Sequence, residues 1–177
     1  ATITGNRFKR SEGIFFRILY EIHKLLTLVF TGKLIKFGNF TCLPKSHVEE
    51  LIKNPNLWNS YSPTVIGTVR DRTFIPSVRG YRYVLPSKMN FTSLVFHSLS
   101  IISVFKNTVI VRSIVFLFIY FILIFKNISL INILPILLLF LFTAYILKIS
   151  TRANMEEFNK SLENIGSIDI LDSPNSG

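Results

Sequence analysis

Two long apolar runs lie close together in the second half of the chain, at residues 108–125 and 128–147. Each approaches the ~20 residues that a helix needs to cross the hydrocarbon core of a bilayer. A helix in a soluble protein also needs a polar face, which these runs lack. Only Lys126-Asn127 separates them, so the pattern predicts a transmembrane helical hairpin within residues 107–151.

Residues 11–30 repeat apolar side chains with the period of a helix, while Arg17, Glu21 and Lys24 share the opposite face. This pattern predicts an amphipathic helix that stops at Gly32. Such a helix either covers the core of a domain or lies on the membrane surface. The basic residues just before it would favour the second location.

Shorter elements are expected between this helix and the hairpin. The patterns predict, in order, a strand at 34–43 with a bend at Gly38-Asn39, a short helix at 46–53, a largely helical stretch at 57–70 and an extended arm at 74–85. The short helix is expected to begin with a capping box formed by Ser46 and Glu49.

Residues 92–106 predict an amphipathic helix with a narrow and nearly uncharged polar stripe. The polar residues of that stripe are Ser93, His97, Ser100 and Ser103. A stripe of this kind is typical of a helix at the water–lipid boundary. Arg112, near the start of the first apolar run, can extend its charge toward the headgroups. The residues expected at the membrane interface are therefore Ser93, His97, Ser100 and Arg112.

The formal net charge of +10 is unevenly distributed. Residues 1–91 hold 14 Lys and Arg against five Asp and Glu, whereas residues 152–177 hold two against five. The positive-inside rule thus predicts a multi-pass protein of the cell's inner (cytoplasmic) membrane with both termini cytoplasmic. The acidic tail at 152–177 is expected to be flexible. No nucleic-acid recognition motif accompanies the basic charge, so nucleic acid is not an expected partner.

One cysteine and one cluster of cations complete the candidate chemistry. Cys42 is the only cysteine, which excludes an intramolecular disulfide, and we expect it to be a small buried apolar residue. No metal-ligand spacing accompanies it. The cations are Arg70, Arg72, Arg79, Arg82 and Lys88. They form either a solvated face that pairs with lipid phosphates or a grip on a phosphate or pyrophosphate group through forked hydrogen bonds.

Two stretches resemble the C-terminal part of membrane-bound family-2 glycosyltransferases, related to the polyprenyl-phosphate (dolichyl-phosphate) sugar synthases. The first contains Arg79-Gly80-Tyr81-Arg82-Tyr83 and Ser87-Lys88, and the second runs from His97 to Arg112. The resemblance covers roughly residues 7–150 and rests on the order of short motifs and on the hairpin that follows them. Gly38-Asn39-Phe40-Thr41 departs from the family, in which an arginine often follows the Phe.

The resemblance implies that residues 1–91 are the end of an α/β glycosyltransferase domain of the GT-A kind in an α-rich membrane protein. It also implies transfer of a sugar from a nucleotide sugar to a polyprenyl-phosphate or saccharide acceptor, as in polysaccharide biosynthesis. The residues then expected to bind phosphate or acceptor are Arg79, Arg82, Ser87 and Lys88.

The family's Asp-x-Asp motif, which holds the nucleotide and Mg²⁺ or Mn²⁺, does not occur in this sequence. We therefore expect the chain to be a fragment that is inactive alone, with metal and nucleotide bound in a missing N-terminal half. Catalytic residues stay unassigned, and a homo-oligomer is left open. The competing interpretation is a small non-enzymatic two-span membrane anchor or subunit.

Overall fold

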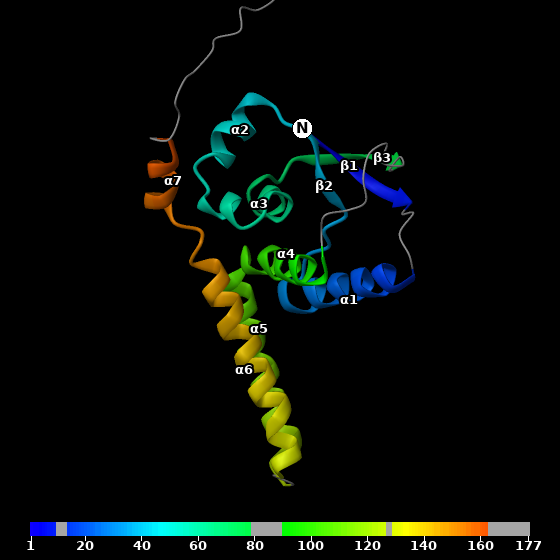
Figure 1. Ribbon diagram of the computed structural model, residues 1–177, viewed down its shortest axis with the longest axis vertical. Coiled ribbons are helices and arrows are strands. Elements are labelled where there is room, and N and C mark those ends of the chain that lie inside the picture. Colours follow the sequence, from blue (N-terminus) through cyan, green and yellow to red (C-terminus); the bar gives the residue numbers. More distant parts are fainter. Residues whose placement is uncertain (10–13, 79–89, 127–128, 163–177) are drawn as a thin grey trace, which may run out of the picture.

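The protein has a small mixed unit of strands and helices at one end and a long two-helix stalk at the other (Figure 1). The computed structural model describes residues 1–9, 14–78, 90–126 and 129–162. Helices dominate the described part, and its three strands form one sheet. A helix-rich protein with two apolar helices was predicted, and the described residues confirm it at that level.

The sheet consists of strands β1 (Thr2–Lys9), β2 (Phe37–Cys42) and β3 (Arg72–Val78) in the order β2-β1-β3. Strand β1 lies in the centre, antiparallel to β2 and parallel to β3. Its register with β2 shifts between Thr4 and Asn6. The shift lies opposite Gly38-Asn39, where the sequence predicted a bend, and β-bulges produce local bends of this kind.

Helices α2 (Lys45–Leu51) and α3 (Tyr61–Thr68), with a short 3-10 helix at Pro55–Trp58, pack beside the sheet. Leu51, Val65 and Val69 form their buried core. The capping box predicted at Ser46 and Glu49 is wrong, because α2 begins at Lys45 with Pro44 as N-cap and no side-chain cap bond. Polar links to the strands include a 2.7 Å contact between Thr2 Oγ1 and His47 Nδ1 and a hydrogen bond between Thr41 and Tyr61.

Helices α1 (Ile14–Thr31) and α4 (Phe91–Ser103) lie between the sheet and the stalk (Figure 1). Helix α1 is the amphipathic helix that the apolar period predicted, and it ends where Gly32 adopts a positive φ of 69°. A second buried cluster of Ile102, Val109 and Ile146 joins α4 to the stalk, and Phe30 of α1 packs against it. The two helices therefore connect the small sheet unit to the stalk.

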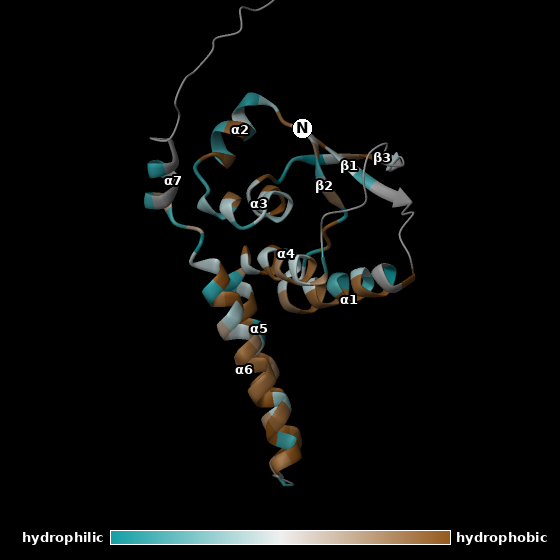
Figure 2. Cartoon of the chain, viewed as in Figure 1, coloured by the Kyte–Doolittle hydropathy of each residue, from teal (hydrophilic) through white to brown (hydrophobic). Residues whose placement is uncertain are grey.

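The stalk is a hairpin of α5 (Lys106–Ile124) and α6 (Leu130–Ser150). Both helices are long and apolar enough to cross a membrane. In the most apolar 18-residue stretch of each helix, only 11% of α5 and 6% of α6 is buried inside the protein. In Figure 2, most of the ribbon of the stalk has the colour of hydrophobic residues. Hydrogen bonds from Thr143 Oγ1 to Ser113 Oγ (2.9 Å) and from the Tyr120 hydroxyl to the Asn132 carbonyl (3.1 Å) join the two helices.

A last helix, α7 (Met155–Leu162), follows the hairpin. From the sequence, a flexible acidic tail was expected over residues 152–177; α7 occupies part of this range, and residues 163–177 lie outside the described residues. Asn154 Oδ1 accepts a 2.9 Å hydrogen bond from the Glu156 amide at the start of α7, and Lys160 pairs with Glu156 one turn apart at 2.9 Å. These local interactions stabilise a helix despite the acidic composition.

Candidate functional site

The predicted phosphate-binding residues Arg79, Arg82, Ser87 and Lys88 lie outside the described residues. The structure does define where the segment that carries them begins and ends. It leaves the sheet after Val78 at the end of β3, and it enters α4 at Asn90. Asn90 Oδ1 caps α4 by accepting a 2.8 Å hydrogen bond from the Ser93 amide. The basic segment thus joins an edge strand to a helix that packs on the stalk.

The predicted extended arm at 74–85 is in its first part a strand of the sheet. Residues of β3 from Arg72 onward pair with β1 in parallel register. The Arg72 side chain binds the end of α3, where its Nη1 donates to the carbonyls of Val65 (3.1 Å), Ile66 (2.7 Å) and Val69. Partial desolvation lowers the pKa of the Arg72 guanidinium from its ordinary value, but the group keeps its positive charge near neutral pH. Arg72 therefore caps a helix.

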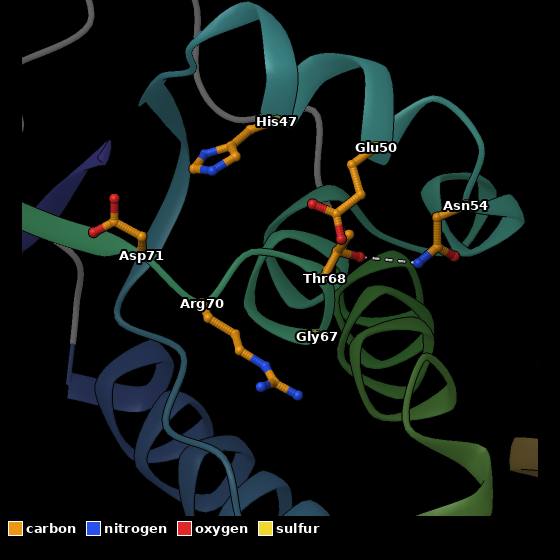
Figure 3. A pocket seen from close by; sticks show the side chains of 7 residues that line it. All are labelled: His47, Glu50, Asn54, Gly67, Thr68, Arg70 and Asp71. Atoms are coloured by element: carbon orange, nitrogen blue, oxygen red, sulfur yellow. Dashed lines mark hydrogen bonds between the residues drawn. The ribbon is translucent and has the colours of Figure 1, made fainter.

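Arg70 lines an open cavity of about 680 Å³ beside the sheet (Figure 3). The side chains and backbone that line it belong to His47, Glu50, Asn54, Gly67, Thr68, Arg70 and Asp71. Asn54 Nδ2 donates to Thr68 Oγ1 at 3.0 Å across one wall, and the Arg70 guanidinium extends away from the carboxylates of Glu50 and Asp71. Two carboxylates and an imidazole around a wide polar cavity suit a hydrated polar group better than an apolar one.

Sequence reasoning missed this cavity because its walls come from separate elements. His47, Glu50 and Asn54 belong to α2 and the turn after it, whereas Thr68 to Asp71 connect α3 to β3. No short spacing joins the two groups in the sequence. Within the described ranges, no group of three or more His, Cys, Asp or Glu side chains could hold a metal ion.

The polar stripe of α4 is turned partly into the protein. Ser100 is only 2% exposed and donates to the Phe96 carbonyl at 2.9 Å, and Ser103 is fully buried and donates to the Ser100 carbonyl at 2.9 Å. Their hydroxyls are thus satisfied within α4 and do not line its outer surface. Ser93, near the start of the helix, is exposed. His97 is exposed at the surface of α4, but neighbouring atoms partly desolvate its imidazole, which lowers its pKa from the ordinary value.

Arg112 occupies a position that the sequence did not predict. Its Nη1 donates to the carbonyls of Leu28 (3.2 Å) and Val29 (2.6 Å) in the last turn of α1. The last four carbonyls of a helix have no partner within the helix. A cation beside them also interacts favourably with the negative end of the helix dipole. The Arg112 side chain therefore links the C-terminal end of α1 to α5 by hydrogen bonds. The expectation that it extends to the headgroups omitted this much closer partner.

One face of the sheet carries apolar side chains without a cover among the described residues. Ile3 pairs in register with Cys42, and Gly5 lies beside Phe40 and pairs with Ile75, so these residues share one face. Ile3, Phe40, Cys42 and Ile75 are all exposed, Phe40 to 70%. The expectation that Cys42 is buried is therefore wrong for the described residues. Within the described part of the chain, this face of the sheet therefore forms an exposed apolar patch.

The fold does not by itself connect this chain to a protein of known activity. Comparisons of the chain with family models, with curated proteins and with solved structures find no match. A functional assignment consequently depends on the residues, on the resemblance of the short motifs, and on the arrangement of the sheet, the basic segment and the hairpin.

Proposed function

We propose that this chain is the membrane-attached, acceptor-binding part of a glycosyltransferase that moves a sugar from a nucleotide sugar to a lipid-linked or saccharide acceptor. The observation that carries the proposal is the position of the two ends of the basic segment. One end is the edge strand β3 and the other is the N-cap of α4, the helix that packs on the stalk. Cations between a domain and a bilayer are well situated to bind the phosphate of a membrane lipid.

In this proposal Arg79, Arg82 and Lys88 supply positive charge where the acceptor phosphate lies and where negative charge develops on the leaving nucleotide. Ser87 adds a hydroxyl donor beside them. The bond between the sugar and the nucleoside diphosphate breaks as the sugar bonds to the acceptor oxygen, and the nucleoside diphosphate leaves. Fixed cations stabilise that transition state because they need no reorganisation during the reaction.

The uncovered face of the sheet supports the further proposal that another part of the enzyme completes this domain. Exposed Phe40 and Ile75 would pack against that part. Nucleotide binding, and any Mg²⁺ or Mn²⁺, belong to that other part in the proposal. The membrane in question is the cytoplasmic membrane, with both termini of the chain on its cytoplasmic side.

The test is the affinity of the chain, in lipid nanodiscs, for a short polyprenyl phosphate. We expect Arg82→Ala and Lys88→Ala each to weaken binding about tenfold or more, because a charge-assisted hydrogen bond contributes ~1.5–3 kcal/mol. Lys45→Ala is the matched control, since Lys45 is a 92% exposed cation on α2. Unchanged affinity in both site variants, or equal binding of the uncharged polyprenol, would contradict the proposal.

The same uncovered sheet face favours one competing function, a non-enzymatic anchor that holds a protein partner through Ile3, Phe40 and Ile75. The coding sequence before Ala1 separates the two ideas. A domain with an Asp-x-Asp motif in the same reading frame supports the enzyme, and a stop codon there supports the anchor. Selective binding of polyprenyl phosphate over phosphatidylglycerol would also count against the anchor.

A further inference from the structure

Helix α1 displays an unbroken apolar stripe that the rest of the described protein does not cover. Its residues are Ile14, Ile18, Ile22, Leu25 and Val29, spaced by three or four positions and therefore aligned along one side of the helix. All are exposed, Ile14 to 76% and Leu25 to 60%. Leaving five aligned aliphatic side chains in water is unfavourable, because transfer of apolar surface out of water stabilises a protein.

The stripe faces away from the side of α1 that contacts the protein. Thr27 and Thr31 are buried, and Phe30 packs on Phe116 of α5 and Phe142 of α6 with ring centroids 5.7 and 4.5 Å apart. At 100° per residue, the centre of the stripe lies roughly opposite Thr27. Figure 2 shows apolar colour along the lower side of α1, the side toward which the stalk extends.

The position of α1 along the stalk is set by the hydrogen bonds from Arg112. Arg112 is six residues after Lys106, the first residue of α5, which corresponds to about 9 Å along a helix. The end of α1 is therefore held about one and a half turns down the first membrane-length helix. A helix lying in the plane of a bilayer surface buries its apolar face ~5–10 Å into the boundary between headgroups and acyl chains, so the two depths agree.

The charges around the stripe match an anionic lipid surface. Arg17 and Lys24 lie along one side of it, together with Glu21, whose carboxylate pairs with Lys24 at 2.8 Å. Lys33 and Lys36 follow the helix as exposed cations. Helix α4 adds a second patch of exposed apolar residues, Phe91, Val95 and Phe96. No Asp or Glu occurs between Asp71 and Glu156. Apolar side chains bordered by cations are the pattern of helices that bind anionic membrane surfaces.

We propose that α1 is a membrane-embedded helix that lies in the plane of the bilayer, with the Ile14–Val29 stripe in contact with lipid. The hairpin crosses the membrane, and α1 lies across its surface at the level of Arg112. The attachment therefore has two perpendicular parts, which fixes the height and the tilt of the sheet unit above the bilayer. This inference does not depend on sugar transfer.

The experiment uses the full chain in nanodiscs containing phosphatidylglycerol, with Cys42→Ser to remove the only cysteine. An environment-sensitive fluorophore is attached at a single introduced cysteine, Ile18→Cys or Leu25→Cys on the stripe. Lys24→Cys, about 120° around the same helix from the centre of the stripe, is the matched control. Quenching is measured with lipids brominated near the upper end of the acyl chain and, separately, with iodide in the aqueous phase.

We expect a several-fold greater loss of fluorescence to brominated lipid at Ile18 and Leu25 than at Lys24, and the reverse order for iodide. Equal iodide quenching at all three positions would overturn the proposal by showing that the stripe faces water. Protection of Ile18 and Leu25 from both quenchers would also overturn it, because a second copy or another protein would then cover the stripe.

Discussion

Replacing Arg112 provides the most direct test of how α1 is attached to the hairpin. Arg112 Nη1 donates to two carbonyls of α1, at 3.2 and 2.6 Å. Hydrogen bonds from a charged donor contribute ~1.5–3 kcal/mol, so Arg112→Ala should lower the free energy of opening α1 by about 2 kcal/mol. Since 1.4 kcal/mol corresponds to a factor of ten, the opened population should rise about thirtyfold.

Gly32 supplies the second half of a double-mutant cycle. For any residue other than glycine, adopting the φ of 69° found at Gly32 costs ~1–2 kcal/mol. A Cβ placed there would also lie 2.6 Å from Arg112 Nη2. The flexible end of Arg112 would move aside and lose its carbonyl partners. Gly32→Ala should therefore cost about 3–4 kcal/mol in the natural chain but only its backbone part, about 1–2 kcal/mol, when residue 112 is already alanine.

Hydrogen exchange of the amides in the last two turns of α1, measured in nanodiscs, reports this opening directly. Arg70→Ala is the matched control, because Arg70 is an exposed arginine that caps no helix in the described structure. It should change the exchange by less than ~0.5 kcal/mol. Strictly additive effects of the Arg112 and Gly32 substitutions would refute the reasoning, because additivity means that the two residues do not act on each other.

Two further predictions concern α4 and the hairpin. Desolvation lowers the pKa of folded His97, so the unfolded state binds the proton more readily and stability should fall as pH drops through ~6.5, the ordinary value. His97→Asn should reduce the slope of melting temperature against pH between about 7.5 and 5, and an unchanged slope would contradict the desolvation argument. Thr143→Val removes the 2.9 Å hydrogen bond to Ser113 and should cost ~0.6 kcal/mol, with ~1.7 as an upper bound, in detergent unfolding titrations. Thr108→Val, at an exposed position in α5, should have no comparable effect, and equal losses in the two variants would show that the interhelix bond does not contribute.

Elements defined by local periodicity were predictable from the sequence. The apolar spacing that specifies α1, α4, α5 and α6 depends on neighbours within a few residues, and Gly32 ends α1 because it tolerates a positive φ. Strand β1 was missed, since Thr2–Lys9 contains Gly5-Asn6 and lacks a regular alternation of apolar and polar residues. It becomes a strand because β2 and β3, far along the chain, pair with both of its edges.

The candidate site was less predictable, for the same physical reason. The Arg112 side chain binds a carbonyl 84 residues earlier in the chain, and the cavity beside the sheet combines α2 with the segment before β3. Sequence spacing carries no information about such pairs. The proposed roles of Arg79, Arg82, Ser87 and Lys88 stay predictions, because these residues lie outside the described part of the chain.

The link between α1 and Arg112 also has a consequence for the order in which the chain is made. Synthesis proceeds from the N-terminus, so α1 leaves the ribosome long before Arg112 does. Until then, the carbonyls of Leu28 and Val29 lack their partner from α5. The final contact between α1 and α5 therefore forms only after the chain has been made as far as Arg112, so the N-terminal half completes its packing late in synthesis.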